Sequence, residues 1–279
     1  MHLLEFNDGT IRKEIPSCWN ELGPDDLFGL FLYLQSRTPI HQVKIKMLVR
    51  AVGMQIIQDK KERSKGVIAG LDGTIDLEQI SQLAECFDFL FTEPDADGNC
   101  VLDMNLTENP VKYLFKENDP GVALSGITYG QYQYLCHYLS ILESAPKEAL
   151  NGIAGTLFQP ESVQTVDNSF DMEAWLMQFP KLVRCDLPVC AGYYQTIILW
   201  YVTGSMRLLA DQFPKVFGGS NGGDDDPGDV YRAQLKLLDT LTDGDVTKRE
   251  AVRGTNLWDV LHNLEMRIEK NEERKNNTL

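Results

Sequence analysis

Hydrophobic residues recur at helical spacing along most of the chain. In residues 24–37 the apolar stripe consists of Leu27, Leu30, Phe31 and Leu34. These positions are i, i+3, i+4 and i+7, which places them on one face of an α-helix. Comparable patterns predict further helices over residues 42–57, 76–91, 128–142, 146–160, 187–214 and 257–264. The pattern therefore predicts a mainly α-helical protein.

The start of the chain departs from this helical pattern. Two short runs, HLLEF at residues 2–6 and IRKEI at residues 11–15, flank the step Asp8-Gly9. An Asp-Gly step supplies the positive φ angles that a tight hairpin turn needs. We expect a small N-terminal β-hairpin that Pro16 terminates.

Two polar, glycine-containing stretches are the candidate boundaries. Residues 59–75 are predicted to form a loop, and residues 218–229, GGSNGGDDDPGD, have the composition of an acidic, glycine-rich linker. The expected organisation has three parts. They are a β-hairpin with helices at 1–58, a central helical domain at 76–217 and a C-terminal helical segment at 229–279.

The densest group of reactive side chains lies in GITYGQYQYLCHYL, residues 126–139. Thr128 and Gln131 have the spacing of a capping box, in which each side chain binds an N–H group that the helix start leaves unpaired. Cys136 shares the apolar stripe of this helix, so we expect a buried and unreactive thiol. His137 is its neighbour in sequence but points about 100° away around the helix. We interpret the stretch as structural.

Charge and composition exclude several classes of function. The formal net charge of −15 repels a phosphate backbone, so we expect no nucleic-acid partner. The longest apolar stretch, residues 191–210, contains Arg207 and has acidic flanks, which favours a buried helix over a membrane span. The first residues lack a basic region followed by an apolar run, so no signal peptide is expected. The six cysteines fit neither a zinc site nor a disulfide scaffold, which indicates reduced thiols in the cytoplasm.

Motifs that bind metals or perform catalysis are missing from the sequence. Asp95, Asp97 and Asn99 have EF-hand spacing, but Cys100 and Leu106 occupy the positions where that loop needs glycine and glutamate. We therefore expect a turn there and no metal or other cofactor. An enzyme whose site is assembled from scattered residues remains the alternative. Its candidate residues are Cys185, Asp186, Cys190 and His137.

Three segments together resemble a known group of proteins. They are IPSCWNELGPDDLFGLFLYL at 15–34, NDPGVALSGITYGQYQYLCHYL followed by EALNGIAGTLFQP within 118–160, and LLDTLTDGDVTKREAVRGTNLWDVLHNLEMRIEKNEE at 237–273. In this order they resemble tail-assembly-associated and other morphogenesis proteins of tailed bacteriophages and prophages. In those proteins an (L/I)T(F/Y)G(E/Q)(F/Y) step opens a helix and a DGD segment leads into the C-terminal helices.

The resemblance implies a non-enzymatic protein that works through protein–protein contacts. The implied partners are other phage structural or assembly proteins, or further copies of this chain, without a membrane partner. The implied location is the host bacterial cytoplasm during assembly, or the finished virion.

The segment after the linker is the candidate for binding a partner. Only about fifty residues follow the linker, near the lower limit at which a helical unit stands alone. Trp258, beside Leu257 and Leu261, is the expected anchor, because tryptophan near an apolar stripe is common at interfaces. The alternative is that Trp258 packs on the protein's own core.

Overall fold

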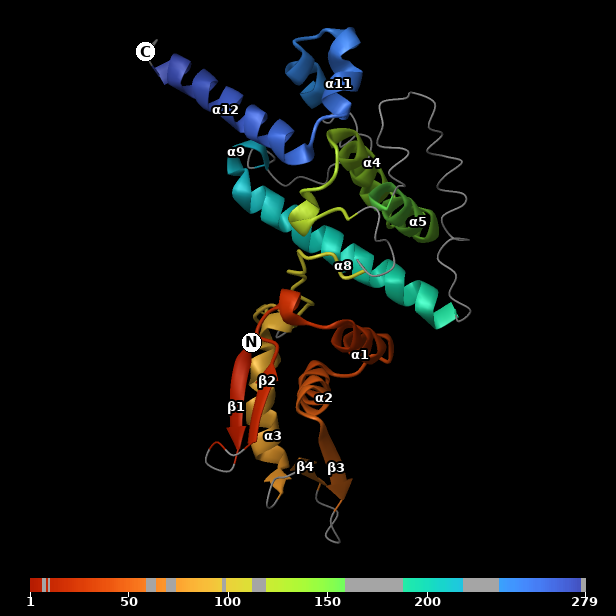
Figure 1. The fold of residues 1–279 in the computed structure, drawn as a ribbon, viewed down its shortest axis with the longest axis vertical. Helices are drawn as coiled ribbons and strands as arrows, with labels where there is room; N and C mark the ends of the chain where they lie inside the picture. The colour runs from red at the N-terminus through yellow and green to blue at the C-terminus, as the bar shows by residue number, and fades with distance from the viewer. Residues whose placement is uncertain are drawn as a thin grey trace. The chain divides into compact units, whose positions relative to one another are not determined.

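The computed structural model describes residues 1–6, 9, 11–58, 64–68, 74–96, 99–111, 119–158, 188–217 and 236–276. The chain divides into two compact units, Met1–Asn105 and Leu106–Leu279. It is mainly α-helical, with a small N-terminal β-hairpin, which confirms the predicted fold class (Figure 1). None of the described helices is long and apolar enough to cross a membrane. The acidic linker at 218–229 lies outside the described residues.

The N-terminal hairpin consists of β1 (His2–Phe6) and β2 (Ile11–Ile15). The strands are antiparallel, and Phe6 is opposite Ile11 at the end nearest the turn. Gly9 has a φ angle of 86°, the left-handed conformation that the Asp-Gly step predicted. Ile15 at the other end is fully buried and attaches the hairpin to the helices of unit 1.

The described residues of the first unit also form three helices and two short 3-10 turns. In chain order they are η1 (Trp19–Glu21), α1 (Pro24–Gln35), α2 (Ile40–Val52), α3 (Leu77–Ala84) and η2 (Glu85–Leu90). The α2 helix contacts α1, α3, η2 and β2, so it lies at the centre of this unit. Val43, Met47 and Leu48 on α2 are buried there.

The predicted helix over residues 42–57 is too long. The α2 helix ends at Val52 because Gly53 adopts a left-handed φ of 69°, and its N–H closes the last turn. The chain then forms β3 (Met54–Gln58), which pairs with β4 (Ser64–Ile68). A short β5 (Ile75–Asp76) completes an antiparallel sheet of order β3-β4-β5. The loop predicted over 59–75 was therefore wrong for the residues that form β4 and β5.

The predicted helix over residues 76–91 is correct at its start. Asp76 accepts a hydrogen bond from the Gln79 N–H at 2.8 Å, and the Gln79 side chain accepts one from the Asp76 N–H at 3.2 Å. This reciprocal pair is the capping box that the sequence indicated. After Ala84 the α-helix tightens into η2, where Phe87 has a non-helical φ of −99° and ψ of 15°. In this tighter segment Phe87 and Leu90 are both buried in the core.

The described residues of the second unit form helices that loops and turns connect. Its elements are η3 (Val122–Leu124), α4 (Tyr129–Ser140), α5 (Pro146–Leu157), α8 (Pro188–Gln212), α9 (Pro214–Phe217), η4 (Val246–Lys248), α11 (Arg249–Arg253) and α12 (Leu257–Asn276). Residues 236–242 are also helical. The α4 and α5 helices lie side by side, and α5 also contacts α8 (Figure 1).

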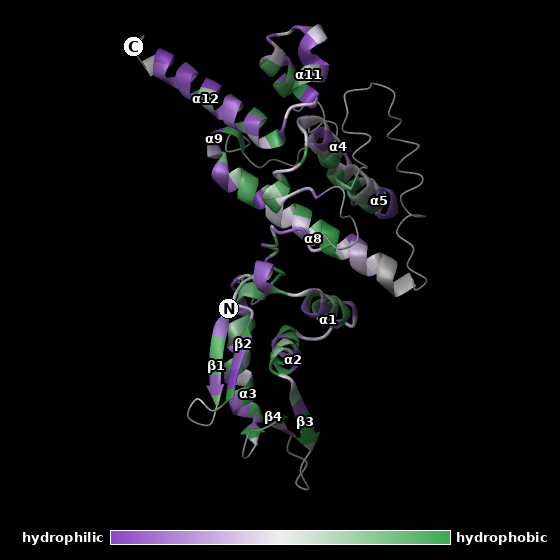
Figure 2. Cartoon of the chain, in the orientation of Figure 1, coloured by the Kyte–Doolittle hydropathy of each residue, from purple (hydrophilic) through white to green (hydrophobic). Residues whose placement is uncertain are grey.

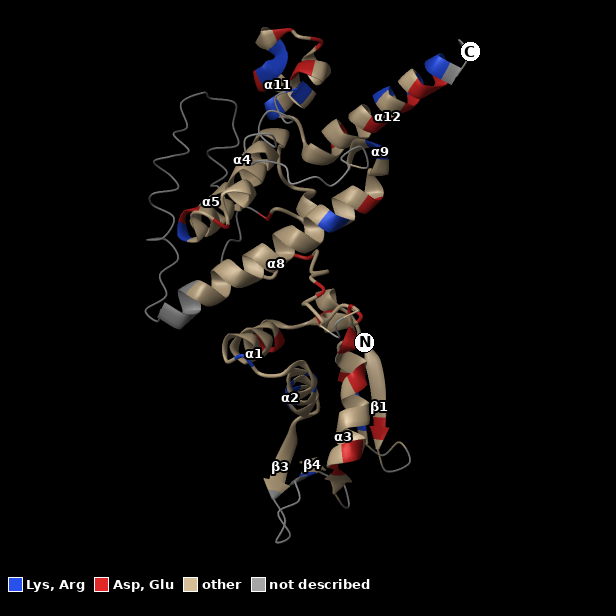
Figure 3. Cartoon of the chain, turned by 180° about the vertical axis from the view of Figure 1, so that it is seen from behind, with Lys and Arg blue, Asp and Glu red and all other residues tan. Residues whose placement is uncertain are grey.

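The hydropathy and charge of two long helices differ. The α8 helix carries hydrophobic residues along most of its length, and only Arg207 and Asp211 are charged (Figures 2 and 3). The α12 helix is hydrophobic at its start and becomes polar and highly charged toward its end (Figures 2 and 3). Burial follows this pattern, since Leu257, Leu261 and Leu264 are buried whereas residues 270–275 are exposed.

Candidate functional site

A strained loop lies at the centre of the second unit. Ala123 and Leu124 have φ angles of 50° and 61°, and Gly121 has one of 75°. The left-handed conformation costs a residue other than glycine roughly 1–2 kcal/mol, so neighbouring contacts must hold this backbone in place. We call residues 119–128 the central loop. Ala123, Leu124 and Ile127 are buried within it.

Tyr201 on α8 holds the central loop from one side. Its hydroxyl donates to the Gly121 carbonyl oxygen at 2.5 Å and accepts from the Leu124 N–H at 3.4 Å. Tyr201 is fully buried, and burial raises the pKa of its phenol above the ordinary value. The phenol therefore stays protonated and keeps its ability to donate.

The start of α12 holds the central loop through two side chains. The Trp258 indole Nε1–H donates to the Ala123 carbonyl oxygen at 3.1 Å. The Asn256 amide donates to the Ser125 carbonyl oxygen at 2.7 Å, and its oxygen accepts from the Trp258 backbone N–H at 2.9 Å. Asn256 thus caps α12 and binds the loop at the same time.

The two chain segments also exchange backbone hydrogen bonds. The Tyr129 N–H donates to the Thr255 carbonyl oxygen at 2.8 Å, and the Leu257 N–H donates to the Ile127 carbonyl oxygen at 3.0 Å. These bonds form an antiparallel bridge between Thr128 and Asn256. As a result α4 and α12 begin next to each other, although more than a hundred residues separate them in sequence.

The structure brings the three predicted partner-binding residues together at the start of α12. Leu257 and Leu261 are fully buried in the core of the second unit. Trp258 is half-buried, and its ring meets Phe213 edge-on at 5.4 Å between centroids. This arrangement agrees with the alternative that Trp258 packs on the protein's own core. A partner that approached this site would meet part of the indole, and neither leucine.

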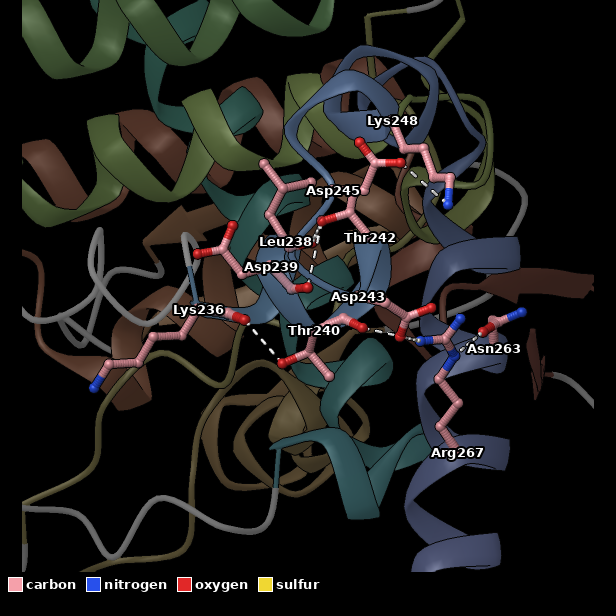
Figure 4. Close-up of polar contacts among 10 residues, drawn as sticks. All are labelled: Lys236, Leu238, Asp239, Thr240, Thr242, Asp243, Asp245, Lys248, Asn263 and Arg267. Atoms are coloured by element: carbon pink, nitrogen blue, oxygen red, sulfur yellow. Dashed lines mark hydrogen bonds and ion pairs between the residues drawn. The ribbon is translucent and has the colours of Figure 1, made fainter.

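The DGD segment, Asp243-Gly244-Asp245, both ends one helix and starts the next (Figure 4). Asp243 and Gly244 have φ angles of 53° and 77°, and the Gly244 N–H donates to the Asp239 carbonyl oxygen at 2.9 Å. This is the left-handed stop of a Schellman motif. Asp245 then caps η4 through the Thr247 N–H at 3.0 Å.

Arg267 fixes this turn to α12. Its guanidinium donates to the Thr240 carbonyl oxygen at 2.9 Å and lies 3.4 Å from the Asp243 carboxylate (Figure 4). The Asn263 side chain orients the same guanidinium at 3.0 Å. A cation at the C-terminal end of residues 236–242 is favourable, because the last carbonyls of a helix carry partial negative charge. These contacts attach residues 236–248 to α12.

The α4 helix confirms the structural interpretation of its tyrosines and cysteine. Thr128 and Gln131 form the predicted capping box. Cys136 is buried, and burial raises the pKa of its thiol to about 11. Tyr134 and His137 are exposed on the opposite side. A protonated, buried thiol is a poor nucleophile, so Cys136 behaves as a small apolar side chain.

The residues of the enzyme alternative are not assembled by the described part of the structure. Cys185 and Asp186 lie outside the described residues, as does the side chain of Cys190, and His137 points outward from α4. The described residues contain no group of three or more His, Cys, Asp or Glu side chains arranged to hold a metal ion. Asp97 of the EF-hand-like spacing also lies outside the described residues, while Asp95 accepts from the Asn99 N–H at 2.8 Å.

The sequence indicated Trp258, as a partner anchor or as a residue packed on the protein's own core, but gave no role to Tyr201, Asn256 or the central loop. Their roles depend on contacts between segments that are 77 to 135 residues apart.

Comparisons with protein-family models, curated proteins and solved structures found no match to this chain.

Proposed function

We propose that this chain is a non-enzymatic morphogenesis protein of a tailed bacteriophage or prophage, and that it acts through protein–protein contacts. The proposal rests on the order of the three resembling segments, above all the ITYGQY step at 127–132 and the DGD segment at 243–245. Each of these short patterns alone is typical of any well-capped helix. The order of the patterns along the chain therefore supports the proposal better than any single pattern does.

The observation that supports the proposal best is the bridge between Thr128 and Asn256. It joins the second resembling segment to the third, and Trp258 and Asn256 of the third segment bind the central loop of the second. Segments that share one unit are expected to recur together in a protein family, since neither is complete without the other. This favours one inherited unit over two unrelated capped helices.

In this proposal the exposed helical surfaces of the second unit make the contacts. Tyr134 on the outer face of α4 is 47% exposed, and an exposed tyrosine offers a large, rigid contact area with a polar end. The partners would be phage structural or assembly proteins. The chain would act in the host cytoplasm during assembly or remain in the finished virion.

Affinity capture from cells that produce phage particles tests the proposal. A tagged chain should co-purify with other virion or assembly proteins, as identified by mass spectrometry of the captured material and of purified particles. Tyr134→Ala should reduce capture at least tenfold while leaving the melting temperature unchanged. Met266→Ala on α12, which changes a side chain of similar exposure, is the matched control. Capture of no phage protein, together with unaltered particles from cells that lack the chain, would contradict the proposal.

A further inference from the structure

The two described sheets have four outer strands, and one of them differs from the rest. Charged side chains on an outer strand normally prevent it from pairing with another chain. Such charges are present as Glu5 on β1, as Arg12, Lys13 and Glu14 on β2, and as Asp76 on the two-residue β5. The fourth outer strand, β3, reads MQIIQ and carries no charge, proline or glycine, and it is uniformly tan in Figure 3.

The β3 strand also exposes an isoleucine on each of its faces. Ile56 is 46% exposed and Ile57 is 44% exposed. Consecutive side chains of a strand point to opposite faces, so the outer part of β3 is apolar on both. Among the described residues, β3 exchanges backbone hydrogen bonds only with β4. Every second residue of an outer strand directs its N–H and C=O away from the sheet, which leaves β3 able to accept a further strand.

We propose that β3 pairs antiparallel with β3 of a second copy of this chain, which forms a two-fold symmetric dimer. In an antiparallel pair, a residue whose N–H and C=O point toward the partner strand faces another residue of the same kind. When the two strands are identical and related by a two-fold axis, that axis must therefore pass through a single residue position. An axis through Ile56 places Ile56 opposite Ile56 of the second copy. An axis through Ile57 does the same for Ile57. Either pairing therefore sets isoleucine against isoleucine, a favourable cross-strand pair.

The size of the contact sets the strength of the dimer. Five-residue strands and four half-exposed isoleucines cover less area than the roughly 1,200 Å² at which stable interfaces begin. We therefore expect a reversible dimer whose dissociation constant lies in the range of about 10–100 μM. The pairing does not depend on the proposed phage role.

Sedimentation velocity of the full chain between about 1 and 200 μM tests the pairing, because this range brackets the expected dissociation constant. The wild-type chain should shift from monomer to dimer. Ile56→Lys and Ile57→Lys should each weaken the dimer at least tenfold, because a charge on an outer strand opposes strand addition. Leu3→Lys on β1 is the matched control, since Leu3 is also an exposed apolar residue on an outer strand, with 52% exposure. It should leave the dimer unchanged.

Three results would overturn the proposal. They are a wild-type chain that stays monomeric at 200 μM, a dimer that both isoleucine variants retain, and a dimer that Leu3→Lys weakens equally. Circular dichroism of each variant confirms that the fold is intact. As a second readout, amide hydrogen exchange in residues 54–58 should slow with increasing concentration in the wild type and not in Ile57→Lys.

Discussion

At the scale of single residues, Trp258 combines two roles that can be separated. Its indole N–H binds the Ala123 carbonyl oxygen, and its ring packs on Phe213. The hydrogen bond holds a left-handed residue of the central loop, whereas the ring covers part of the core. Phenylalanine would keep most of the ring contact and lose only the donor.

We predict that Trp258→Phe lowers the free energy of unfolding by about 1 kcal/mol, the usual cost of one lost hydrogen bond. Trp258→Ala should cost about 3 kcal/mol, because it also removes the packed ring. Urea denaturation of both variants measures this difference. If Trp258→Ala unfolds at the wild-type urea concentration but no longer binds a partner, the residue is an interface anchor instead.

The buried thiol of Cys136 makes stability depend on alkaline pH. Its pKa is raised from an ordinary value of 9.0 to about 11. In the unfolded chain the thiol ionises above pH 9, while the folded thiol stays protonated until about pH 11. The contribution of the protonated thiol to the free energy of unfolding is therefore complete below pH 9. It is lost as the pH rises from 9 to 11, by about 2–3 kcal/mol in total.

We therefore predict that Cys136→Ala loses less stability than the wild type between pH 8 and pH 10.5. Urea denaturation at the two pH values measures the difference. Reaction with a thiol reagent at pH 8 is an independent check, because folded Cys136 should react far more slowly than exposed Cys18. Equal rates would show that the thiol is accessible.

At the scale of elements, the contact between α4 and α5 depends on a glycine. A β-carbon at Gly152 would lie 2.3 Å from the ring of Tyr138, which is too close without movement of the ring or the helix. We predict that Gly152→Ala destabilises the chain by about 1–2 kcal/mol through this overlap. In a Tyr138→Ala background the same change should be neutral or stabilising, because alanine is the better helix former.

Gly254→Ala is the control for this prediction. Gly254 has a negative φ of −75°, and its nearest neighbour to an added β-carbon is 3.6 Å away. Thermal denaturation of the single and double variants should show a loss at Gly152 alone. A loss that persists without the Tyr138 ring would mean that the overlap is not the cause.

The sequence predicted the elements whose start and end signals are local. Asp76 with Gln79 and Thr128 with Gln131 marked two helix starts correctly, and Asp8-Gly9 marked the hairpin. It did not separate α2 from β3, because the apolar residues continue past Gly53 and only pairing with β4 makes them a strand. The central loop had a local turn signal only at Pro120-Gly121, and none for the residues that directly follow. Its left-handed residues are Ala123 and Leu124, and the side chains that stabilise them come from α8 and α12.

At the scale of the whole molecule, the two units differ in how local their contacts are. The first unit ends at Asn105 and has its own buried core, which includes Leu30, Leu48, Ile80 and Phe87. In the second unit the central loop is bound by Tyr201 and Trp258, which lie 80 and 135 residues away from their partners in sequence. A segment with its own core can fold alone.

We predict that residues 1–105 fold as an isolated fragment and show cooperative thermal unfolding by circular dichroism. A fragment of residues 106–235, which lacks α12, should not, because Ala123 and Ser125 lose their partners and the apolar core that Leu257 and Leu261 fill would be left open. Restoring residues 236–279 should recover the transition. If the fragment that lacks α12 unfolded cooperatively by itself, the central loop would not need its downstream partners.

The position of Trp258 far downstream of the central loop also bears on the order of synthesis. The ribosome delivers the chain from the N-terminus at about 5–20 residues per second, and domains generally fold as they emerge. The first unit is complete after Asn105, but Trp258 binds a carbonyl group made 135 residues earlier. The central loop therefore waits for this partner while the ribosome adds a further 135 residues. A message cut short between Asn105 and Trp258 would yield a folded first unit joined to a second unit that chaperones and proteases recognise as unfinished.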